Sequence, residues 1–279
     1  MCIRDSRETL LDIGLNKYLF DMANIRNQDS WVHMNDREKA TDKAKDLVRM
    51  AVARAALLKP LQEKKVEIKQ SGLVVGGGIA GMNAALNLAQ QGYDVTIVEK
   101  GMELGGLARL VSHTIEGLEV QPYIDRLIAE VNANERIRVF TNAKVALFKG
   151  YKGNFTTKVL TLADMKEHTI QHGVTIVATG AKEYKPKEYG YGLEGVMTQL
   201  ELDHLLHSKG DGPSQWQRVV MIQCVGSRNE ENPNCSRICC QSAVKHALQI
   251  KEMNPETDVY ILYRDMRMYG MLEDLSLIH

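Results

Sequence analysis

The glycine-rich stretch from Ser71 to Gly106 constrains this chain more than any other feature. At its centre, residues 73–81 read LVVGGGIAG, so that an apolar strand leads directly into the spacing G-x-G-x-x-G. A helical pattern with apolar residues on one face follows, and Gly92 has the position of a left-handed cap at its end. A second strand, Tyr93 to Val98, finishes next to the acid Glu99. The stretch therefore predicts one βαβ unit of the dinucleotide-binding kind.

Each glycine of this fingerprint has a separate physical task. Gly76 permits the tight turn, Gly78 leaves room for a pyrophosphate beside the backbone, and Gly81 lets the helix pack closely on the strand. The first helical residues, Ile79 and Ala80, offer free N–H groups at the positive end of the helix dipole, where phosphates bind.

The acid at the end of the second strand indicates which dinucleotide is bound. Glu99 is placed to accept hydrogen bonds from ribose hydroxyls, and a carboxylate there disfavours a 2′-phosphate. The pattern therefore favours FAD or NAD over NADP.

Two further segments favour FAD. After Lys100 the chain reaches Gly105-Gly106, which resembles the acid-then-Gly-Gly extension of flavoproteins with two dinucleotide domains. A buried-strand pattern beginning at Gly173 ends in Ala178-Thr179-Gly180, which is similar to the strand that returns to the flavin in the same proteins. The predicted FAD contacts are Gly76, Gly78, Ile79, Ala80, Gly81, Glu99, Lys100, Gly105, Gly106, Ala178, Thr179 and Gly180.

The rest of the chain predicts an α/β protein in three regions. Residues 1–70 are mostly helical, with one helix that Asp36 caps and Pro60 closes; His33, before it, is expected to be a loop histidine held by hydrogen bonds. Residues 71–213 form the FAD-binding Rossmann-like domain with its connector. They include a helix at 123–131 and a β-meander with strands at 136–141, 144–149 and 154–160. Residues 214–279 form a second α/β half, which is incomplete.

Charge and composition exclude several classes of function. Lysine plus arginine equals aspartate plus glutamate at 35 each, and no basic block indicates a nucleic-acid partner. No uninterrupted apolar run approaches the length of a membrane span, since Ala51 to Leu58 is broken by Arg54, so we expect no transmembrane segment and no signal peptide.

The cysteines point to a reducing, cytoplasmic setting. Of the five cysteines, four lie between residues 224 and 240, which does not make a disulfide scaffold. We expect residues 1–6 and 275–279 to be stray ends of a fragment of a longer protein, so Cys2 carries no functional weight.

The four clustered cysteines form a second chemical motif, C-x10-C-x3-C-C, made of Cys224, Cys235, Cys239 and Cys240. They lie at the end of a strand predicted at 219–224 and at the start of a helix predicted at 239–253, where the helix dipole, Arg228 and Arg237 favour thiolates. Four thiols suit zinc or an iron–sulfur cluster. The vicinal pair argues against zinc knuckles, and a flavin nearby favours a redox cluster; zinc, or four unligated thiols, stay open.

Several motifs closely resemble the family of heterodisulfide reductase A subunits, whose members are FAD-containing iron–sulfur proteins. They are QCVGSR at 223–228, NPNCSRICC at 232–240, AVK at 243–245 and YRDMR at 263–267, with further likeness at 24–33, 45–51 and 188–192. The resemblance covers nearly the whole chain apart from its ends, as an N-terminal fragment of such a protein.

The resemblance implies a thioredoxin-reductase-like FAD-dependent iron–sulfur oxidoreductase that relays electrons between FAD and [4Fe-4S] clusters in a soluble multi-subunit complex. Its partners would be iron–sulfur subunits and hydrogenase or dehydrogenase modules, and in some members the flavin bifurcates electrons. The four clustered cysteines would then ligate one [4Fe-4S] cluster. Two departures stand out: no ferredoxin module with C-x-x-C runs interrupts the FAD domain, and Asp29 stands where some members have cysteine.

Two other functions remain open. An NAD(P)H-dependent flavin disulfide reductase of the thioredoxin reductase type would need a second glycine fingerprint and a redox disulfide, but the second half reads CVGSR at 224–228, where its strand ends. A non-catalytic redox scaffold subunit would carry the same cofactors. No acid–base pair is evident, so no side chain is predicted to be catalytic, and the flavin and the cluster are the predicted redox centres.

Overall fold

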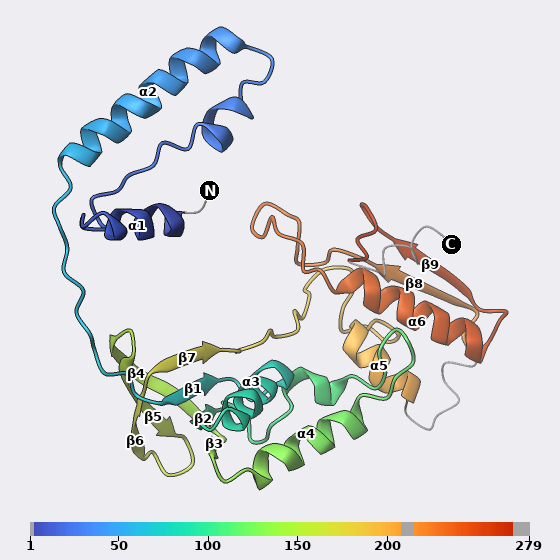
Figure 1. Cartoon of the computed structure of the whole chain (residues 1–279). Helices are drawn as coiled ribbons and strands as arrows, with labels where there is room; N and C mark the ends of the chain where they lie inside the picture. The colour runs from blue at the N-terminus through green and yellow to red at the C-terminus, as the bar shows by residue number, and fades with distance from the viewer. Residues whose placement is uncertain (1–2, 208–214, 270–279) are drawn as a thin grey trace. The chain divides into compact units, whose positions relative to one another are not determined.

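The structure is a computed structural model that describes residues 3–207 and 215–269. The chain divides into two compact units, Met1–Val66 and Glu67–His279 (Figure 1). The predicted boundary between the second and third regions, at residue 213, lies outside the described residues and stays a prediction, as does the expectation for Cys2.

The first unit contains two α-helices and one short π-helix. These are α1 (Ile3–Asp12), η1 (Arg26–Ser30) and α2 (Arg37–Ala56). Asp36 caps α2 as expected, with its carboxylate accepting the N–H of Lys39, but the helix ends at Ala56, before Pro60. His33 Nε2 lies 3.3 Å from Lys43 Nζ, which agrees with a hydrogen-bonded loop histidine. Helix α1, with helix-forming residues such as Arg7, Glu8 and Leu10, lies in the region predicted to be mostly helical, but it begins at Ile3, within residues that were expected to be a stray end.

The second unit begins with a parallel sheet in the order β3-β2-β1-β7. Its strands are β1 (Ser71–Val75), β2 (Asp94–Val98), β3 (Ile137–Phe140) and β7 (Val174–Val177). The helices α3 (Ile79–Gln90) and α4 (Gln121–Ala133) and the 3-10 helix η2 (Gly106–Leu110) lie between these strands in the chain. The predicted FAD-binding Rossmann-like fold is therefore confirmed.

An antiparallel sheet of three strands interrupts this parallel sheet, in the order β4-β5-β6. Its strands are β4 (Ala143–Tyr151), β5 (Asn154–Thr161) and β6 (Glu167–His172). The meander strands predicted at 144–149 and 154–160 correspond to β4 and β5. The meander strand predicted at 136–141 is instead β3, which pairs with β2 in the parallel sheet. Strand β6 was missed because Ile170 is its only aliphatic residue, so the apolar alternation that signals a strand is weak there.

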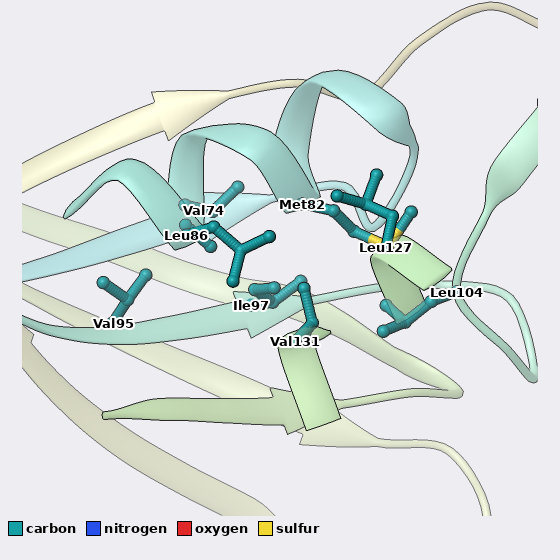
Figure 2. Packing of buried hydrophobic residues seen from close by; sticks show 9 residues of the cluster. Val74, Met82, Leu86, Val95, Ile97, Leu104, Leu127 and Val131 are labelled. Atoms are coloured by element: carbon teal, nitrogen blue, oxygen red, sulfur yellow. The ribbon is translucent and has the colours of Figure 1, made fainter. Parts of the chain in front are cut away.

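The core of the FAD-binding domain lies between α3, α4 and the parallel sheet. Figure 2 shows Val74 and Ile97 from the strands, Met82 from α3, and Leu127 from α4 directed toward one another. All four side chains are at most 4 % exposed. Leu104, which follows Glu99 in the chain, is buried in the same cluster, so packing anchors the loop that leads to Gly105. Burial of each such side chain contributes about 1.5–3 kcal/mol.

The C-terminal part of the second unit is a smaller α/β element. It contains α5 (Gln199–His207), β8 (Arg218–Ile222), α6 (Cys239–Met253) and β9 (Asp258–Leu262), with β8 and β9 parallel. Helix α6 begins and ends where the sequence predicted. Strand β8 stops at Ile222, so Gln223 and Cys224 belong to the loop. Among the residues that the structure describes, no helix is long and apolar enough to cross a membrane.

Candidate cofactor site

The glycine fingerprint forms a loop between β1 and α3 whose shape requires glycine at two positions. Gly76 has φ +109°, and a side chain there would overlap the Ala178 carbonyl. A side chain on Gly81 would overlap the Gly76 carbonyl. At Gly78, by contrast, a Cβ atom would meet nothing within 4 Å, so the backbone borders open space on that side. This is the arrangement that a pyrophosphate needs in order to approach the backbone.

The start of α3 adds hydrogen-bond donors to this open side. Gly78 is the N-cap and supplies no side-chain cap. The N–H groups of the first turn, on Ile79, Ala80 and Gly81, have no partners within the helix, and they carry the positive end of its dipole. The first turn can therefore bind an anionic group.

The Glu99 carboxylate holds the glycine loop in place through hydrogen bonds. Its side chain is 9 % exposed, and its two carboxylate oxygens accept the N–H groups of Gly77 at 2.6 Å and Gly101 at 2.7 Å. Each carboxylate oxygen has a further lone pair, so these bonds leave acceptor capacity for ribose hydroxyls. The sequence indicated only the ribose contact; the structure adds this bracing role. The neighbouring Lys100 is exposed.

The Gly-Gly segment lies directly against the fingerprint. Gly105 donates its N–H to the Gly77 carbonyl at 2.8 Å and pairs with Gly78 in an isolated β-bridge. A Cβ atom on Gly106 would lie 3.3 Å from the Gly78 Cα atom. Both Gly105 and Gly106 have positive φ, which suits glycine. The close backbone approach explains why two glycines stand here.

The segment after β7 closes the third side of the loop. Ala178 donates its N–H to the Val75 carbonyl at 2.8 Å, and its own carbonyl faces Gly76. The Thr179 backbone also borders Gly76, and Gly180 has φ +64°. The structure thus brings together at residues 76–78 the three segments that sequence analysis assigned to FAD, and this cradle fits a dinucleotide.

The four predicted cluster ligands lie in the loop after β8 and at the start of α6. All four are free thiols: Cys240 is buried and the other three are partly exposed. Backbone N–H groups point at two of them, from Arg237 to Cys235 at 3.4 Å and from Arg267 to Cys240 at 3.5 Å. Each sulfur that accepts such a bond is stabilised as a thiolate.

The electrostatic surroundings differ between these two thiols. The pKa of Cys235 is lowered, mainly by the Arg237 N–H and further by Tyr269 and the positive charges of Arg267 and Arg228. Burial raises the pKa of Cys240, and the nearby thiols Cys239 and Cys224 act in the same direction. Thiolate formation is therefore easier at Cys235 than at the buried Cys240.

The backbone of this loop is strained. Three of the six non-glycine residues with positive φ in the described chain are Cys224, Arg228 and Arg237, at φ +60°, +55° and +67°. Such conformations cost of order 1–3 kcal/mol each and are concentrated at functional sites. An ion pair of Arg228 with Asp265 helps to hold the loop, and Arg267 Nε lies 2.5 Å from the same carboxylate.

The thiols are nevertheless not arranged around a single metal ion. Within residues 3–207 and 215–269, no group of three or more His, Cys, Asp or Glu side chains is arranged to hold a metal ion. The donor set suits a [4Fe-4S] cluster in its chemistry, whereas its arrangement here gives no assembled metal site. The ligand assignment to Cys224, Cys235, Cys239 and Cys240 thus stays a prediction.

Sequence analysis missed several buried polar groups. Gln223 is 7 % exposed, directly precedes Cys224, and has no partner for either polar atom of its amide. Asp29 is buried with Oδ1 unpartnered. Asp203 is buried among hydrogen-bond donors. A polar residue in an apolar pattern, such as Asp203 beside Leu202, was the only available signal.

A second match to G-x-G-x-x-G, residues 190–195, lies in the connector. These residues form a loop that does not follow a strand, and Gly190, Gly192 and Gly195 all have positive φ. The spacing alone therefore does not make a dinucleotide site here.

Comparison with known proteins defines the class to which this site belongs. A family model described as pyridine nucleotide-disulphide oxidoreductase matches residues 71–222, more than half of the chain. The chain belongs to this oxidoreductase family, and the match supports FAD as the cofactor of the cradle.

Within that class, the chain is similar to A subunits of heterodisulfide reductases, which confirms the resemblance noted in the sequence. It is 34 % identical to the A subunit of the H(2):CoB-CoM heterodisulfide,ferredoxin reductase of Methanothermobacter thermautotrophicus, over 95 % of this chain and 54 % of the relative. It is 32 % identical to the iron-sulfur A subunit of the CoB–CoM heterodisulfide reductase of Methanocaldococcus jannaschii, with the same coverage. The chain thus spans about half the length of these relatives.

The comparisons give two further findings. The alignment to the first relative extends over 354 residues, more than the 279 of this chain, so that relative has segments within the aligned region that this chain lacks. Among solved structures, thioredoxin reductase of Lactococcus lactis covers 76 % of this chain and has 62 % of its own length covered, at 15 % identity and a TM-score of 0.48.

Proposed function

We propose that this chain is part of an electron-transfer subunit that binds FAD in the glycine cradle and one [4Fe-4S] cluster on the cysteine loop. It would relay electrons between the flavin and iron–sulfur clusters in a heterodisulfide-reductase-like complex. The observation that carries the proposal is the convergence of three flavin motifs on residues 76–78, in the same unit as the four free thiols.

The residues of the cradle would each have a defined part in holding FAD. Gly78 and the first turn of α3 would bind the pyrophosphate through backbone N–H groups. Glu99 would accept the ribose hydroxyls while it braces the loop, and its charge would disfavour a 2′-phosphate. Bound FAD would supply two-electron and one-electron chemistry.

The cysteine loop would favour a cluster through charge and backbone strain. Arg228 and Arg267 lower the cost of keeping thiolates, and backbone N–H groups already point at Cys235 and Cys240. Hydrogen bonds to cluster sulfurs are one of the means by which proteins set a cluster potential. The relatives named as iron–sulfur subunits support this assignment.

The partners and the cellular setting follow only from the relatives and from cysteine usage. The relatives are named as subunits of heterodisulfide reductases, and we extend this to expected contacts with iron–sulfur subunits and with hydrogenase or dehydrogenase modules. A cytoplasmic location fits a chain with free thiols. Whether the flavin bifurcates electrons depends on its partners.

One second candidate has a specific observation in its favour. The family model is named for disulphide oxidoreductases that use pyridine nucleotides, so an NAD(P)H-dependent flavin disulfide reductase must be tested. Against it, β8 leads to Gln223 and Cys224 instead of a glycine fingerprint. A redox scaffold subunit would carry the same cofactors and would differ only in lacking its own turnover.

The deciding experiment measures flavin, iron and acid-labile sulfide in protein purified without oxygen, followed by EPR after reduction. We expect about one FAD with about four iron and four sulfide atoms per chain, the composition of a [4Fe-4S] cluster. FAD with zinc or without metal would reject the cluster, and rapid NAD(P)H oxidation with a disulfide acceptor would favour the second candidate.

A further inference from the structure

A buried polar network joins the loop after the Gly-Gly segment to the helix that begins at Cys239. At its centre is Asp203 on α5, whose side chain is 1 % exposed. Its carboxylate oxygen Oδ2 accepts the N–H of Ser112 at 2.8 Å. The other oxygen, Oδ1, accepts Lys245 Nζ in an ion pair and lies 2.9 Å from His246 Nε2.

Further hydrogen bonds connect α5 and α6 to the segment at 112–113. Lys245 Nζ also donates to the His113 carbonyl at 3.2 Å. His113 Nδ1 lies 2.8 Å from His207 Nε2, and the two rings stack at a centroid distance of 4.7 Å. His207 Nδ1 in turn lies 2.7 Å from the Asp203 carbonyl oxygen. Both the side chain and the backbone of Asp203 therefore hold the segment at 112–113.

The two ends of this network, Ser112 and Lys245, lie a few residues along the chain from the proposed cofactor sites. Ser112 follows η2, which begins at Gly106 beside Gly78. Gln121 fixes this connection by donating through Nε2 to the carbonyls of Ala108, Arg109 and Val111. On the other side, Lys245 lies on α6 little more than one turn after Cys240. A displacement at either end would be transmitted through Asp203.

The ionised state of the Asp203 carboxylate favours a stable connection between the two segments. Burial alone would raise the pKa of Asp203, but hydrogen bonds from His246, Lys245 and the Ser112 N–H outweigh it and lower the pKa. Burial lowers the pKa of His246, which favours the neutral imidazole. Its Nε2 lies beside the Asp203 carboxylate, and its Nδ1 lies 2.5 Å from Gln199 Oε1. A buried carboxylate with this many donors is costly to disturb, because losing it would leave buried donors unpaired.

From this geometry we propose that Asp203 is a positioning residue that couples the flavin-binding loop to the cysteine helix. Binding of FAD at Gly78 and Gly106 would order η2 and, through Ser112 and Asp203, the first turns of α6. The inference rests on the proposed FAD site but does not require that the cysteines hold a cluster.

The test is hydrogen–deuterium exchange of the full chain with and without FAD, in the wild type and in Asp203→Asn. In the wild type, FAD protects the residues of the cradle and also the first turns of α6. Asparagine has one acceptor oxygen for donors that approach from two sides, so one side faces an amide N–H group. We expect Asp203→Asn to retain protection at the cradle and to lose it at α6, with exchange there about tenfold faster, as for a lost charge-assisted hydrogen bond.

Glu201→Gln is the matched control on the same helix. Glu201 also bonds a lysine and a hydroxyl, Lys185 and Tyr191, but it lies nearer the surface. This variant should keep the FAD-induced protection of α6. If Asp203→Asn does not fold, Lys245→Met removes one of the two bonds from α6 to Asp203 and leaves those of His246 and the Ser112 N–H. The FAD-induced protection of α6 should then be reduced without disappearing, and unchanged protection would reject the coupling.

Each outcome separates the inference from the proposed function. Absence of FAD protection at the wild-type cradle would reject the proposed FAD site and, with it, the coupling. Protection at the cradle without protection at α6 would reject the coupling alone. Equal loss of α6 protection in Glu201→Gln would also reject it, because the effect would then not be specific to Asp203.

Discussion

The glycine cradle and the cysteine loop are two candidate cofactor sites in one unit, and they are built in different ways. The cradle is made of backbone: glycines at 76, 81, 105 and 106 allow chain segments to touch, and regular hydrogen bonds hold them. The cysteine loop depends on side chains carried by a strained backbone, and in the described residues its thiols are not arranged around a single metal ion. A site defined by backbone contacts is formed by folding itself, whereas a site defined by ligand side chains needs its ligand to complete it.

The largest expected effect tests the claim that the cradle is part of the fold. In Gly81→Ala, the new methyl group would overlap the Gly76 carbonyl, which cannot move without shifting β1. We expect the free energy of unfolding to fall by roughly 3 kcal/mol, at the upper end of overpacking effects. Chemical denaturation measures this; unchanged stability would mean that helix and loop are not in close contact.

Gly78→Val separates ligand binding from folding. Gly78 has φ −76° and open space beyond it, so valine fits the fold but fills the space of the pyrophosphate. FAD binding should be abolished while the melting temperature of the cofactor-free protein changes little. Normal flavin content would refute the site, and loss of folding would show that this side is not open.

Cys235→Ser and Cys239→Ser test the cysteine loop as a cluster site. Each should remove the iron signal while flavin content stays at the wild-type level, because the cradle does not depend on the thiols. Ser236→Ala is the control, since Ser236 Oγ donates a hydrogen bond to Cys239 Sγ at 3.4 Å but is not itself a predicted ligand. Full iron content in both cysteine variants would overturn the ligand assignment.

Substitutions of Gln223 and Gln121 compare a buried amide that has no hydrogen-bond partner with an amide that has several. Gln223→Leu removes an amide without partners, so the free energy of unfolding of cofactor-free protein should rise by about 1 kcal/mol. Gln121→Leu breaks hydrogen bonds to carbonyls and should lower it by about 1 kcal/mol. Equal losses in urea denaturation would mean that Gln223 also has partners in solution.

The smallest expected effect is a dependence of stability on pH through His172, which is buried in the antiparallel sheet. Burial lowers its pKa, so the unfolded chain binds a proton at higher pH than the folded chain. Stability should therefore decrease as the pH falls from the ordinary histidine value near 6.5 through the folded-state pKa. His172→Gln should reduce this slope, and an identical slope would assign the effect to other groups.

The sequence predicted those parts of the sites that depend on local signals. The strand–turn–helix of the fingerprint, the cap at Asp36 and the first residue of α6 all follow from patterns within about twenty residues. It failed where the signal was weak, as in β6. It also gave no sign that Gln223 would be buried without partners, because burial depends on neighbours distant in the chain.

The amino-acid sequence by itself determined the chemistry available to this protein: a glycine loop that admits a phosphate, an acid at the end of β2 and four thiols in a fixed spacing. Only the tertiary structure decided which of these meet. Gly78 touches Gly105, Ala178 faces Gly76, and Asp203 binds both Ser112 and Lys245. The physical reason is that periodicity and capping act between residues close in sequence, whereas contacts between distant segments are set by packing of the whole core.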